Sequence, residues 1–197
     1  YKNEEFRFGH GLTFHVAPAN IALNFAYSFV LSLLAGNSNI VRVSSNKFRQ
    51  NDIFFKILKK IFKLRKFKKI KENNLFLTYD YDEEITGLIS KNADCRVLWG
   101  SDKTIKNIKK VETQTSCKEG VFPDRYSISL FNLNYLSKIK DTDIEKITKK
   151  IYLDSLIFDQ NACSSPHLII WSGNKNGKKY KKFWSSLKMH VEKGKLF

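Results

Sequence analysis

The sequence has few of the residues that hold small proteins together through covalent bonds or metals. Its 197 residues include three cysteines, Cys95, Cys117 and Cys163, and four histidines. The cysteines are odd in number and widely spaced, and none forms a Cys-x-x-Cys pair or a Cys/His cluster with metal-ligand spacing. This excludes a disulfide framework and a zinc-finger type of fold. It predicts free thiols in a reducing, cytoplasmic setting and no metal site.

Long apolar stretches are also missing. The longest one, Ile21–Ala35, is interrupted by Asn24 and Ser28 and is too short to span a bilayer comfortably. No signal peptide is visible, and the first residue is Tyr1, not Met, which indicates an internal piece of a longer protein. We therefore expect no membrane span.

Neither of the two common nucleotide-binding fingerprints is present. The sequence contains no G-x-G-x-x-G and no G-x-x-x-x-G-K-[ST]. This excludes the standard dinucleotide fingerprint and the P-loop. Hydrophobic residues nevertheless make up 42% of the chain, enough for a substantial core.

Acidic residues are outnumbered by basic ones, 19 to 35, which gives a net charge of +16. Such a balance suits anionic partners, namely nucleic acid, anionic lipid or phosphate-bearing small molecules. The basic run Lys56–Lys71 admits two interpretations: a binding module for nucleic acid or an anionic membrane, or the solvated face of an amphipathic helix. No helix-turn-helix or RNA-stacking motif supports a nucleic-acid partner, and we expect none.

The apolar periodicity predicts alternating strands and helices. Buried strands are expected at 12–17 and 39–44, with a helix at 21–34 between them, which is the βαβ unit of a parallel sheet. The expected core stripe of that helix is Leu23, Ala26, Tyr27, Val30, Leu31 and Leu34. The next helix, 51–65, has an expected stripe of Ile53, Phe54, Ile57, Leu58, Ile61 and Phe62.

The same pattern continues to the end of the chain. Further strands are predicted at 74–79, 96–99, 127–132 and 168–171, and further helices at 82–91, 104–111, 143–157 and 179–192. The helix at 143–157 has Asp143 as its expected N-cap. The fold class is therefore α/β, with a Rossmann-like parallel sheet and flanking helices. Strand 96–99 runs into Gly100-Ser101 at a helix start, where free backbone N–H groups favour an anion.

One cysteine has neighbours that suit a reactive thiol. Cys163 lies in Asp159-Gln160-Asn161-Ala162-Cys163-Ser164-Ser165-Pro166, just before an apolar strand. The small neighbours leave room for a substrate to reach the sulfur. Taken alone, the stretch favours an inert loop cysteine over a reactive one.

Five motifs occur in an order that resembles a known family. They are Phe14-His15-Val16-Ala17-Pro18-Ala19-Asn20, the segment Ala35-Gly36-Asn37-Ser38-Asn39-Ile40-Val41-Arg42-Val43-Ser44-Ser45, Val97-Leu98-Trp99-Gly100-Ser101-Asp102, Phe122-Pro123-Asp124-Arg125-Tyr126-Ser127 and the Cys163 stretch. Together they resemble the acyl-CoA reductase family, the fatty-acid reductase component of bacterial luminescence systems, within the aldehyde dehydrogenase superfamily. The resemblance implies a truncated aldehyde dehydrogenase-like fold. Residues 1–121 would form an NADP-binding Rossmann-like domain, and residues 122–197 the beginning of the catalytic domain.

The resemblance also implies roles for individual residues. Cys163 would be the nucleophile that carries an acyl group as a thioester. Asn20 would donate a side-chain N–H to the oxyanion, with capping of a helix beginning at Ile21 as the alternative. Arg42 replaces the usual lysine near the adenosine ribose, and its phosphate-binding geometry favours NADPH over NADH. Ser44 follows on the same strand end. Gly100 and Ser101 would face the cofactor pyrophosphate.

The implied function is NADPH-dependent reduction of a fatty acyl thioester, acyl-CoA or acyl-protein, to the aldehyde. An acyl-protein synthetase partner and homo-oligomerisation at full length are also implied. The Glu-Leu-Gly-Gly run of typical aldehyde dehydrogenases is absent; Asp124 and Glu119 lie in that region, and neither is assigned as a base. The chain ends soon after Cys163, so the activity of this piece alone stays open. The remaining alternative is a catalytically inactive structural relative.

Overall fold

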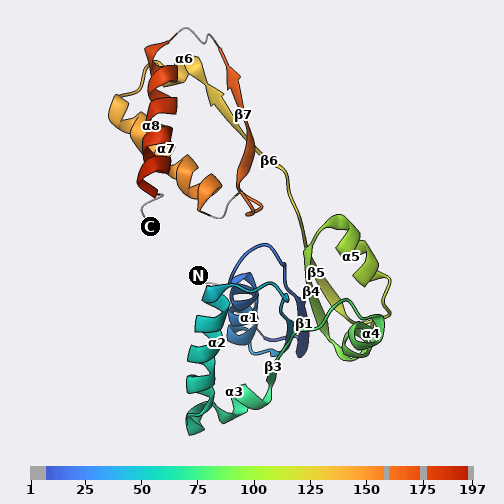
Figure 1. The fold of residues 1–197 in the computed structure, drawn as a ribbon. Helices are drawn as coiled ribbons and strands as arrows, with labels where there is room; N and C mark the ends of the chain where they lie inside the picture. The colour runs from blue at the N-terminus through green and yellow to red at the C-terminus, as the bar shows by residue number, and fades with distance from the viewer. Residues whose placement is uncertain (1–7, 158–159, 174–176, 195–197) are drawn as a thin grey trace, which may run out of the picture. The chain divides into compact units, whose positions relative to one another are not determined.

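A computed structural model describes residues 8–157, 160–173 and 177–194. The chain divides into two compact units, Tyr1–Asp124 and Arg125–Phe197 (Figure 1). The predicted nucleotide-binding and catalytic roles of the two parts of the chain stay predictions.

The first unit is built on a five-stranded parallel sheet with the strand order β3-β2-β1-β4-β5. Every neighbouring pair in it is parallel. The strands are β1 (Leu12–Val16), β2 (Ser38–Arg42), β3 (Asn74–Leu77), β4 (Cys95–Gly100) and β5 (Lys118–Pro123). The chain moves outward from β1 to β3 and then returns to β4 on the other side of β1. This reversal makes the sheet doubly wound, with a topological switch point between β1 and β4.

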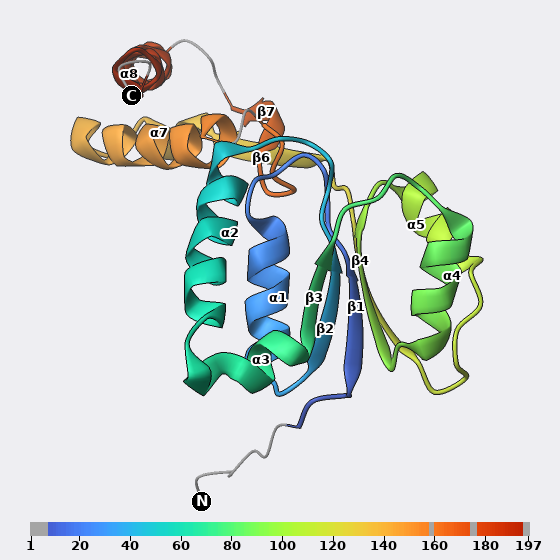
Figure 2. The same cartoon turned by 60° about the horizontal axis from the view of Figure 1, so that its bottom comes forward.

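Helices cover both faces of this sheet. Figure 2 shows α1 (Asn24–Leu34) and α2 (Arg49–Phe62) on one face and α4 (Glu83–Asn92) and α5 (Asp102–Lys109) on the other. A short 3-10 turn, Arg65–Phe67, and α3 (Lys68–Glu72) lead from α2 into β3. The predicted α/β fold with a parallel sheet and flanking helices is confirmed.

Each face of the sheet has its own apolar core. On the α4–α5 face the core consists of Phe14, Val16, Ile89, Ala93, Leu98, Ile105 and Ile108. On the α1–α2 face, Phe25, Phe29 and Val41 pack with partly buried aromatic side chains. There the ring of Phe25 stacks on the ring of Phe55, with centroids 5.3 Å apart. The ring of Phe54 meets Phe25 edge-on, with centroids 5.2 Å apart. Burial of these rings supplies the main attachment of α1 and α2 to the sheet.

The prediction for α1 was wrong in two respects. The helix begins at Asn24, not Ile21, and its N-cap is Leu23, which has a left-handed φ of 61°. The expected core stripe was also largely wrong: Ala26 is buried as expected, but the other buried positions of α1 are Phe25, Ser28 and Phe29. The helix is apolar on more than one side, so periodicity alone did not identify the side that meets the sheet.

The stripe predicted for α2 was partly wrong for a similar reason. Phe54 and Phe55 pack into the core, whereas Ile53, Ile57 and Ile61 are exposed. The lysines of the same helix are exposed as expected. In α5 the helix begins at Asp102 instead of Thr104, because Ser101 caps it.

A buried polar chain crosses three strands beneath α1. His15 is 1% exposed, and its Nε2 lies 2.9 Å from Asn39 Oδ1. The Nδ2 of Asn39 donates to the carbonyl of Asn37 and, at 2.7 Å, to Asn74 Oδ1. Since Asn39 Oδ1 is thus the acceptor, His15 Nε2 donates, and His15 Nδ1 accepts from the hydroxyl of Ser28 at 2.8 Å. Burial lowers the pKa of His15, which favours this neutral form.

The second unit is a βαβ arrangement with a further helix. Strands β6 (Ser127–Asn132) and β7 (Pro166–Ser172) pair in parallel. The helices are α6 (Leu133–Leu136), α7 (Asp141–Leu156) and α8 (Lys178–Gly194). Their shared core is Leu133, Leu136, Ile144, Ile151 and Phe183. The predicted N-cap Asp143 was wrong, because α7 begins two residues earlier, at Asp141. Asp141 and Asp143 both lie in the first turn, where a carboxylate interacts favourably with the helix dipole.

Candidate functional site

A pocket of about 270 Å³ opens at the carboxyl ends of the strands in the first unit. Its lining is Val16, Ala17, Pro18, Ala19, Asn20, Arg42, Trp99, Gly100, Thr104 and Asp124. These residues follow or end β1, β2, β4 and β5, and the pocket therefore lies at the switch point of the sheet. Open α/β sheets bind ligands at this position, because neighbouring connections diverge to opposite faces there.

Three of the residues predicted from separate motifs meet in this pocket. Asn20, Arg42 and Gly100 come from the ends of β1, β2 and β4, and all three line it. Arg42 is half-buried, and its Nε and Nη2 donate to the carbonyl oxygen of Tyr79 at 3.3 and 3.2 Å. Its guanidinium carbon also lies 4.9 Å from the centroid of the Tyr79 ring. These contacts use two of the five guanidinium N–H donors and fix the plane of the group.

The turn after β4 has the geometry of a helix start that can receive an anion. Gly100 has a φ of +153°, and a Cβ placed on it would lie 3.4 Å from two side-chain carbons of Thr104. A side chain at position 100 would therefore be strained and would crowd the beginning of α5. The Ser101 hydroxyl accepts a hydrogen bond from the backbone N–H of Thr104 at 3.3 Å, as an N-cap does. Asp102 in the first turn adds a negative charge that an incoming phosphate would meet.

The loop after β2 is tied to the Pro-x-Asn turn after β1. The Nδ2 of Asn46 donates to the carbonyl of Ala19 at 2.8 Å, and its backbone N–H donates to the hydroxyl of Ser44. Ser44 thus helps to hold the loop beside the turn that contains Asn20, but it does not line the pocket. The N-cap of α1 is Leu23, so the alternative role of Asn20 as a cap for a helix beginning at Ile21 was wrong.

Cys163 lies in the second unit, on the turn between α7 and β7. Its side chain is exposed, and its carbonyl oxygen accepts a 2.6 Å hydrogen bond from the hydroxyl of Ser127 at the start of β6. The hydroxyl of the fully buried Ser165 donates to the carbonyl of Asp154 on α7. The turn is therefore fastened to a strand on one side and to a helix on the other. Asp159, the first residue of the motif that contains Cys163, lies outside the described residues.

The other two cysteines have surroundings that keep them as thiols. Both Cys95 and Cys117 are half-buried and unpaired by disulfides. Burial raises the pKa of Cys95, and the nearby Cys117, Asp94 and Glu119 raise it further. Burial likewise raises the pKa of Cys117. Since the thiolate is the nucleophile, the exposed Cys163 is the better candidate of the three.

The two acidic residues left unassigned by the sequence differ in their surroundings. Glu119 is a structural partner: its Oε1 accepts from Nε of Arg96 at 2.9 Å and forms a salt bridge with Nη2. Arg96 is 2% exposed and also donates to the carbonyls of Ile108 and Val111. Asp124 instead lines the carboxyl-end pocket, where its backbone N–H donates to the carbonyl of Gly100 at 3.1 Å.

Sequence reasoning missed Tyr79 and Thr104. Tyr79 orients Arg42, and Thr104 packs against Gly100 and bonds to Ser101. A possible signal for Thr104 was its place three residues after the capping serine. No feature of the local sequence pairs Tyr79 with Arg42, because that contact depends on β2 and β3 being neighbours.

The described ranges contain neither a metal-binding cluster nor a membrane-spanning helix. No group of three or more His, Cys, Asp or Glu residues in them has the geometry to hold a metal ion. Among the same residues, no helix has both the length and the apolar character needed to cross a membrane.

The chain is similar in fold to solved aldehyde dehydrogenases. An NAD-dependent benzaldehyde dehydrogenase from Corynebacterium glutamicum shares 12% identity, over 93% of this chain and 37% of its own, with a TM-score of 0.66. Betaine aldehyde dehydrogenase from Staphylococcus aureus shares 16% identity, over 94% of this chain and 34% of its own, with a TM-score of 0.63. PnpE of Pseudomonas sp. WBC-3, in complex with nicotinamide adenine dinucleotide, shares 13% identity, over 91% of this chain and 34% of its own, with a TM-score of 0.67. The chain thus spans about a third of the length of these proteins.

The sequence comparisons give the family. No curated protein matches the sequence. The acyl-CoA reductase (LuxC) family, in contrast, matches over residues 1–195, which is nearly the whole chain. The resemblance carried by the five motifs is thereby confirmed, and the chain belongs to the acyl-CoA reductase (LuxC) family.

Proposed function

We propose that this chain carries the cofactor site and the nucleophile of an NADPH-dependent reductase that converts a fatty acyl thioester to the aldehyde. The observation that carries the proposal is the meeting of Asn20, Arg42 and Gly100 in one pocket at the switch point of a doubly wound sheet. Family membership supports the reaction class, and the NAD complex of the structural neighbour PnpE supports a nicotinamide cofactor.

The pocket residues fit part of a phosphorylated nucleotide. The lack of a Cβ at Gly100 lets a phosphate approach the first turn of α5, where backbone N–H groups point outward. Arg42 keeps guanidinium donors beyond the two held by Tyr79, and a guanidinium binds a phosphate through two parallel hydrogen bonds. We assign Arg42 to the 2′-phosphate that distinguishes NADPH from NADH. Ser101 would act through the cap that fixes the first turn.

Cys163 is the proposed nucleophile. Its thiolate attacks the carbonyl carbon of the acyl thioester, the new C–S bond to Cys163 forms, and the C–S bond to the donor breaks. The donor leaves as a thiolate and takes up the proton that the Cys163 thiol released. A nicotinamide cofactor held at the pocket of Arg42 and Gly100 would supply the hydride, and with it the two electrons, that reduction of the acyl carbon requires. Collapse of the resulting hemithioacetal breaks the bond to Cys163 and releases the aldehyde. For Asn20 we propose the oxyanion role, in which a side-chain N–H is worth about 3 kcal/mol in the transition state.

Glu119 does not compete with this scheme as a hydrolytic base, since it is committed to the buried Arg96. A reductase gains from this, because an activated water would hydrolyse the enzyme thioester. The acyl donor, whether acyl-CoA or acyl-protein, contributes only its thioester to the proposed steps.

The experiment is intact-protein mass spectrometry after incubation with a long-chain acyl-CoA. We expect a mass gain of one acyl group that hydroxylamine removes, and no gain for Cys163→Ala. The matched control is Cys117→Ala, which should acylate like the wild type. Acylation of the Cys163→Ala variant, or NADPH titration without saturable binding in a folded sample, would contradict the proposal.

A further inference from the structure

Helix α2 has an apolar stripe that the described structure leaves open to solvent. Ile53, Ile57 and Ile61 follow one another at intervals of four residues, and Leu64 continues the stripe just beyond the end of the helix. These four side chains are 36% to 53% exposed. The residues of α2 that pack into the core are two phenylalanines instead. The stripe is therefore not what attaches α2 to its own unit.

The same segment of the chain is strongly basic. Residues 53–71 contain no acidic side chain, and all nine of their basic side chains are exposed: Lys56, Lys59, Lys60, Lys63, Arg65, Lys66, Lys68, Lys69 and Lys71. Lys68 forms an ion pair with Glu72 at 3.7 Å. The other eight form no ion pair with any residue that the structure describes, so their charges can act on an anionic partner.

The lysines and the isoleucines are neighbours on the surface of α2. Lys56 lies three residues after Ile53, and Lys60 lies three residues after Ile57, a spacing that puts two side chains next to each other on a helix. Figure 2 shows α2 at the outer end of the layer that it forms with α1, with α3 at its foot. Exposed apolar side chains beside a row of lysines are typical of a helix that lies in a membrane interface.

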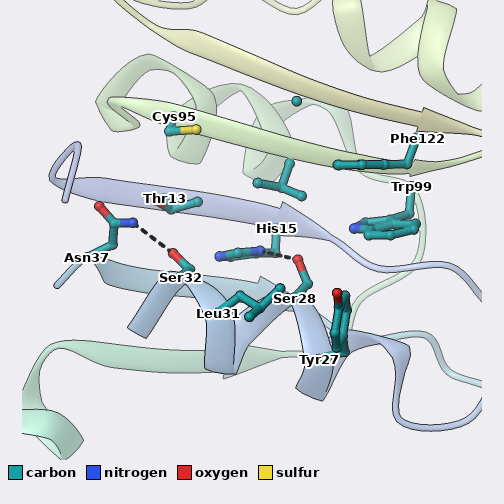
Figure 3. A pocket seen from close by; sticks show the side chains of 12 residues that line it. Thr13, His15, Tyr27, Ser28, Leu31, Ser32, Asn37, Cys95, Trp99 and Phe122 are labelled. Atoms are coloured by element: carbon teal, nitrogen blue, oxygen red, sulfur yellow. Dashed lines mark hydrogen bonds between the residues drawn. The ribbon is translucent and has the colours of Figure 1, made fainter. Parts of the chain in front are cut away.

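Another apolar surface of the first unit differs in its charge. A groove of about 450 Å³ beside α1 (Figure 3) has Leu31, Trp99 and Phe122 in its lining, and none of the described residues that line it is a Lys, Arg, Asp or Glu. Nothing in that lining identifies an occupant. The surface of α2, in contrast, has a charge that restricts the class of partner.

Three classes of partner can be compared for this surface. The phosphates of a nucleic acid would pair with the lysines but leave the isoleucine stripe in water. The centre of a protein interface is usually depleted of lysine. A bilayer with anionic lipid suits both kinds of side chain, because its acyl region receives the isoleucines while long lysine side chains reach the headgroup phosphates.

We propose that the basic, apolar surface of α2 and α3 binds the surface of a membrane that contains anionic lipid. The stripe enters the boundary between headgroups and acyl chains, and the lysines contact the phosphates. The helix lies on the bilayer and does not cross it. This association does not depend on the chemistry proposed for Cys163, but it brings the chain to the phase in which long acyl chains and fatty aldehydes dissolve.

Co-sedimentation with vesicles tests the proposal. The protein is mixed with vesicles of phosphatidylcholine alone, or of equal parts phosphatidylcholine and phosphatidylglycerol, at low and at high salt. We expect binding to the anionic vesicles to be about tenfold tighter or more, and to weaken as salt is added. Ile57→Ser and the double variant Lys56→Gln/Lys60→Gln should each weaken it about tenfold, because insertion and charge both contribute.

Matched substitutions outside the proposed surface are the controls. Leu88 is 69% exposed on α4, and Lys149 and Lys150 are exposed on α7. Leu88→Ser and Lys149→Gln/Lys150→Gln make the same chemical changes there and should leave vesicle binding nearly unchanged. All the altered side chains are exposed, so the melting temperature should also stay the same, which excludes unfolding as the cause of weaker binding.

Insertion of the stripe has a readout of its own. Ile57→Trp places a fluorophore at the centre of the stripe, and brominated phospholipid in the anionic vesicles should quench its emission. Leu88→Trp is the matched control on α4, and its added emission should not be quenched. The three natural tryptophans contribute equally to both variants, so the difference between the variants reports on position 57.

Three outcomes would overturn the proposal. The first is a lack of binding to anionic vesicles, and duplex DNA bound through the same lysines would then be the better partner. The second is an Ile57→Ser variant that binds vesicles as the wild type does, because the attraction would then be charge alone. The third is a dimer, seen by light scattering, that Ile57→Ser dissociates, because a second copy of the chain would then cover the stripe.

Discussion

The hydroxyl of Ser127 donates a hydrogen bond to the carbonyl oxygen of Cys163 across 2.6 Å. The bond joins the first residue of β6 to the turn that precedes β7, so the main chain at the proposed nucleophile is fixed from outside its own turn. Main-chain position matters here because we propose the backbone N–H of Cys163 as an oxyanion donor in addition to the side chain of Asn20.

Loss of that bond should slow acylation more than it destabilises the protein. Ser127→Ala removes a hydrogen bond worth about 1 kcal/mol. We expect single-turnover acylation by a long-chain acyl-CoA to slow about tenfold, because a small displacement of reacting groups is costly. Ser129→Ala on the same strand leaves the Ser127 bond in place and serves as the control. Equal acylation rates in the two variants would show that the bond has no role in positioning.

Arg42 should set the preference for the phosphorylated cofactor. Arg42→Lys keeps the charge but loses the planar fork that Tyr79 orients. We expect NADPH affinity to fall about tenfold, which corresponds to about 1.4 kcal/mol, with little change for NADH. Fluorescence titration against Trp99, which lines the same pocket, measures both. Arg49→Lys at the exposed start of α2 is the matched control, and an equal loss for both cofactors would refute the assignment.

Gly100 and Gly87 should respond oppositely to alanine. Gly100→Ala strains a φ of +153° and crowds Thr104, so we expect a loss of about 1 to 2 kcal/mol and of NADPH binding. Gly87 lies inside α4, where a Cβ makes a 3.8 Å contact with Val111. Gly87→Ala should therefore raise stability by up to about 1 kcal/mol. Urea unfolding measures both, and the same sign for the two variants would be inconsistent with this view of Gly100.

Glu119 should matter for folding. Glu119→Gln leaves the buried charge of Arg96 without its partner, and we expect the free energy of unfolding to fall by about 3 kcal/mol. Glu112→Gln breaks the exposed pair with Lys91 and should cost no more than about 0.5 kcal/mol. Chemical denaturation distinguishes the two. A stable Glu119→Gln variant with altered thioester hydrolysis would instead mark Glu119 as a base.

His15 should make the fold sensitive to mild acid. Because burial lowers its pKa in the folded state below the ordinary 6.5, the unfolded chain binds a proton first as the pH falls. Stability is therefore full above pH 6.5 and declines below it, by up to about 1.4 kcal/mol per pH unit, until the lower folded pKa is passed. Unfolding midpoints between pH 7.5 and 5 measure this slope. His15→Gln does not titrate, and an equally steep decline in that variant would assign the effect to other groups.

The sequence was informative wherever a function requires a particular residue type at a strand end. Asn20, Arg42 and Gly100 were selected from motifs far apart in the chain, and the parallel sheet brings all three to one edge. Their grouping follows from topology, because the carboxyl ends of parallel strands share an edge. The fold class followed for the same reason, from alternation of strand and helix patterns.

What the sequence could not predict depends on tertiary contacts or on unusual backbone conformations. Strand β5 was missed because Gly120 and Pro123 weaken its strand signal, and an edge position tolerates both. The late start of α1 follows from the left-handed φ of Leu23, a conformation that leucine rarely adopts. The errors in the core stripe of α1 have a different origin, since a helix that is apolar on more than one side carries no single periodicity.

The polar chain of His15, Asn39 and Asn74 has a consequence for how the sheet assembles. Strands β1, β2 and β3 are separated in sequence by whole helices, so no hairpin turn sets how far each slides along its neighbour. A slip of one residue would replace His15 with Phe14 or Val16 and leave buried amides with no partner, at a cost of about 1 to 3 kcal/mol for each. The three side chains thus fix the register of these strands, because the observed alignment is far more favourable than one shifted by a single residue.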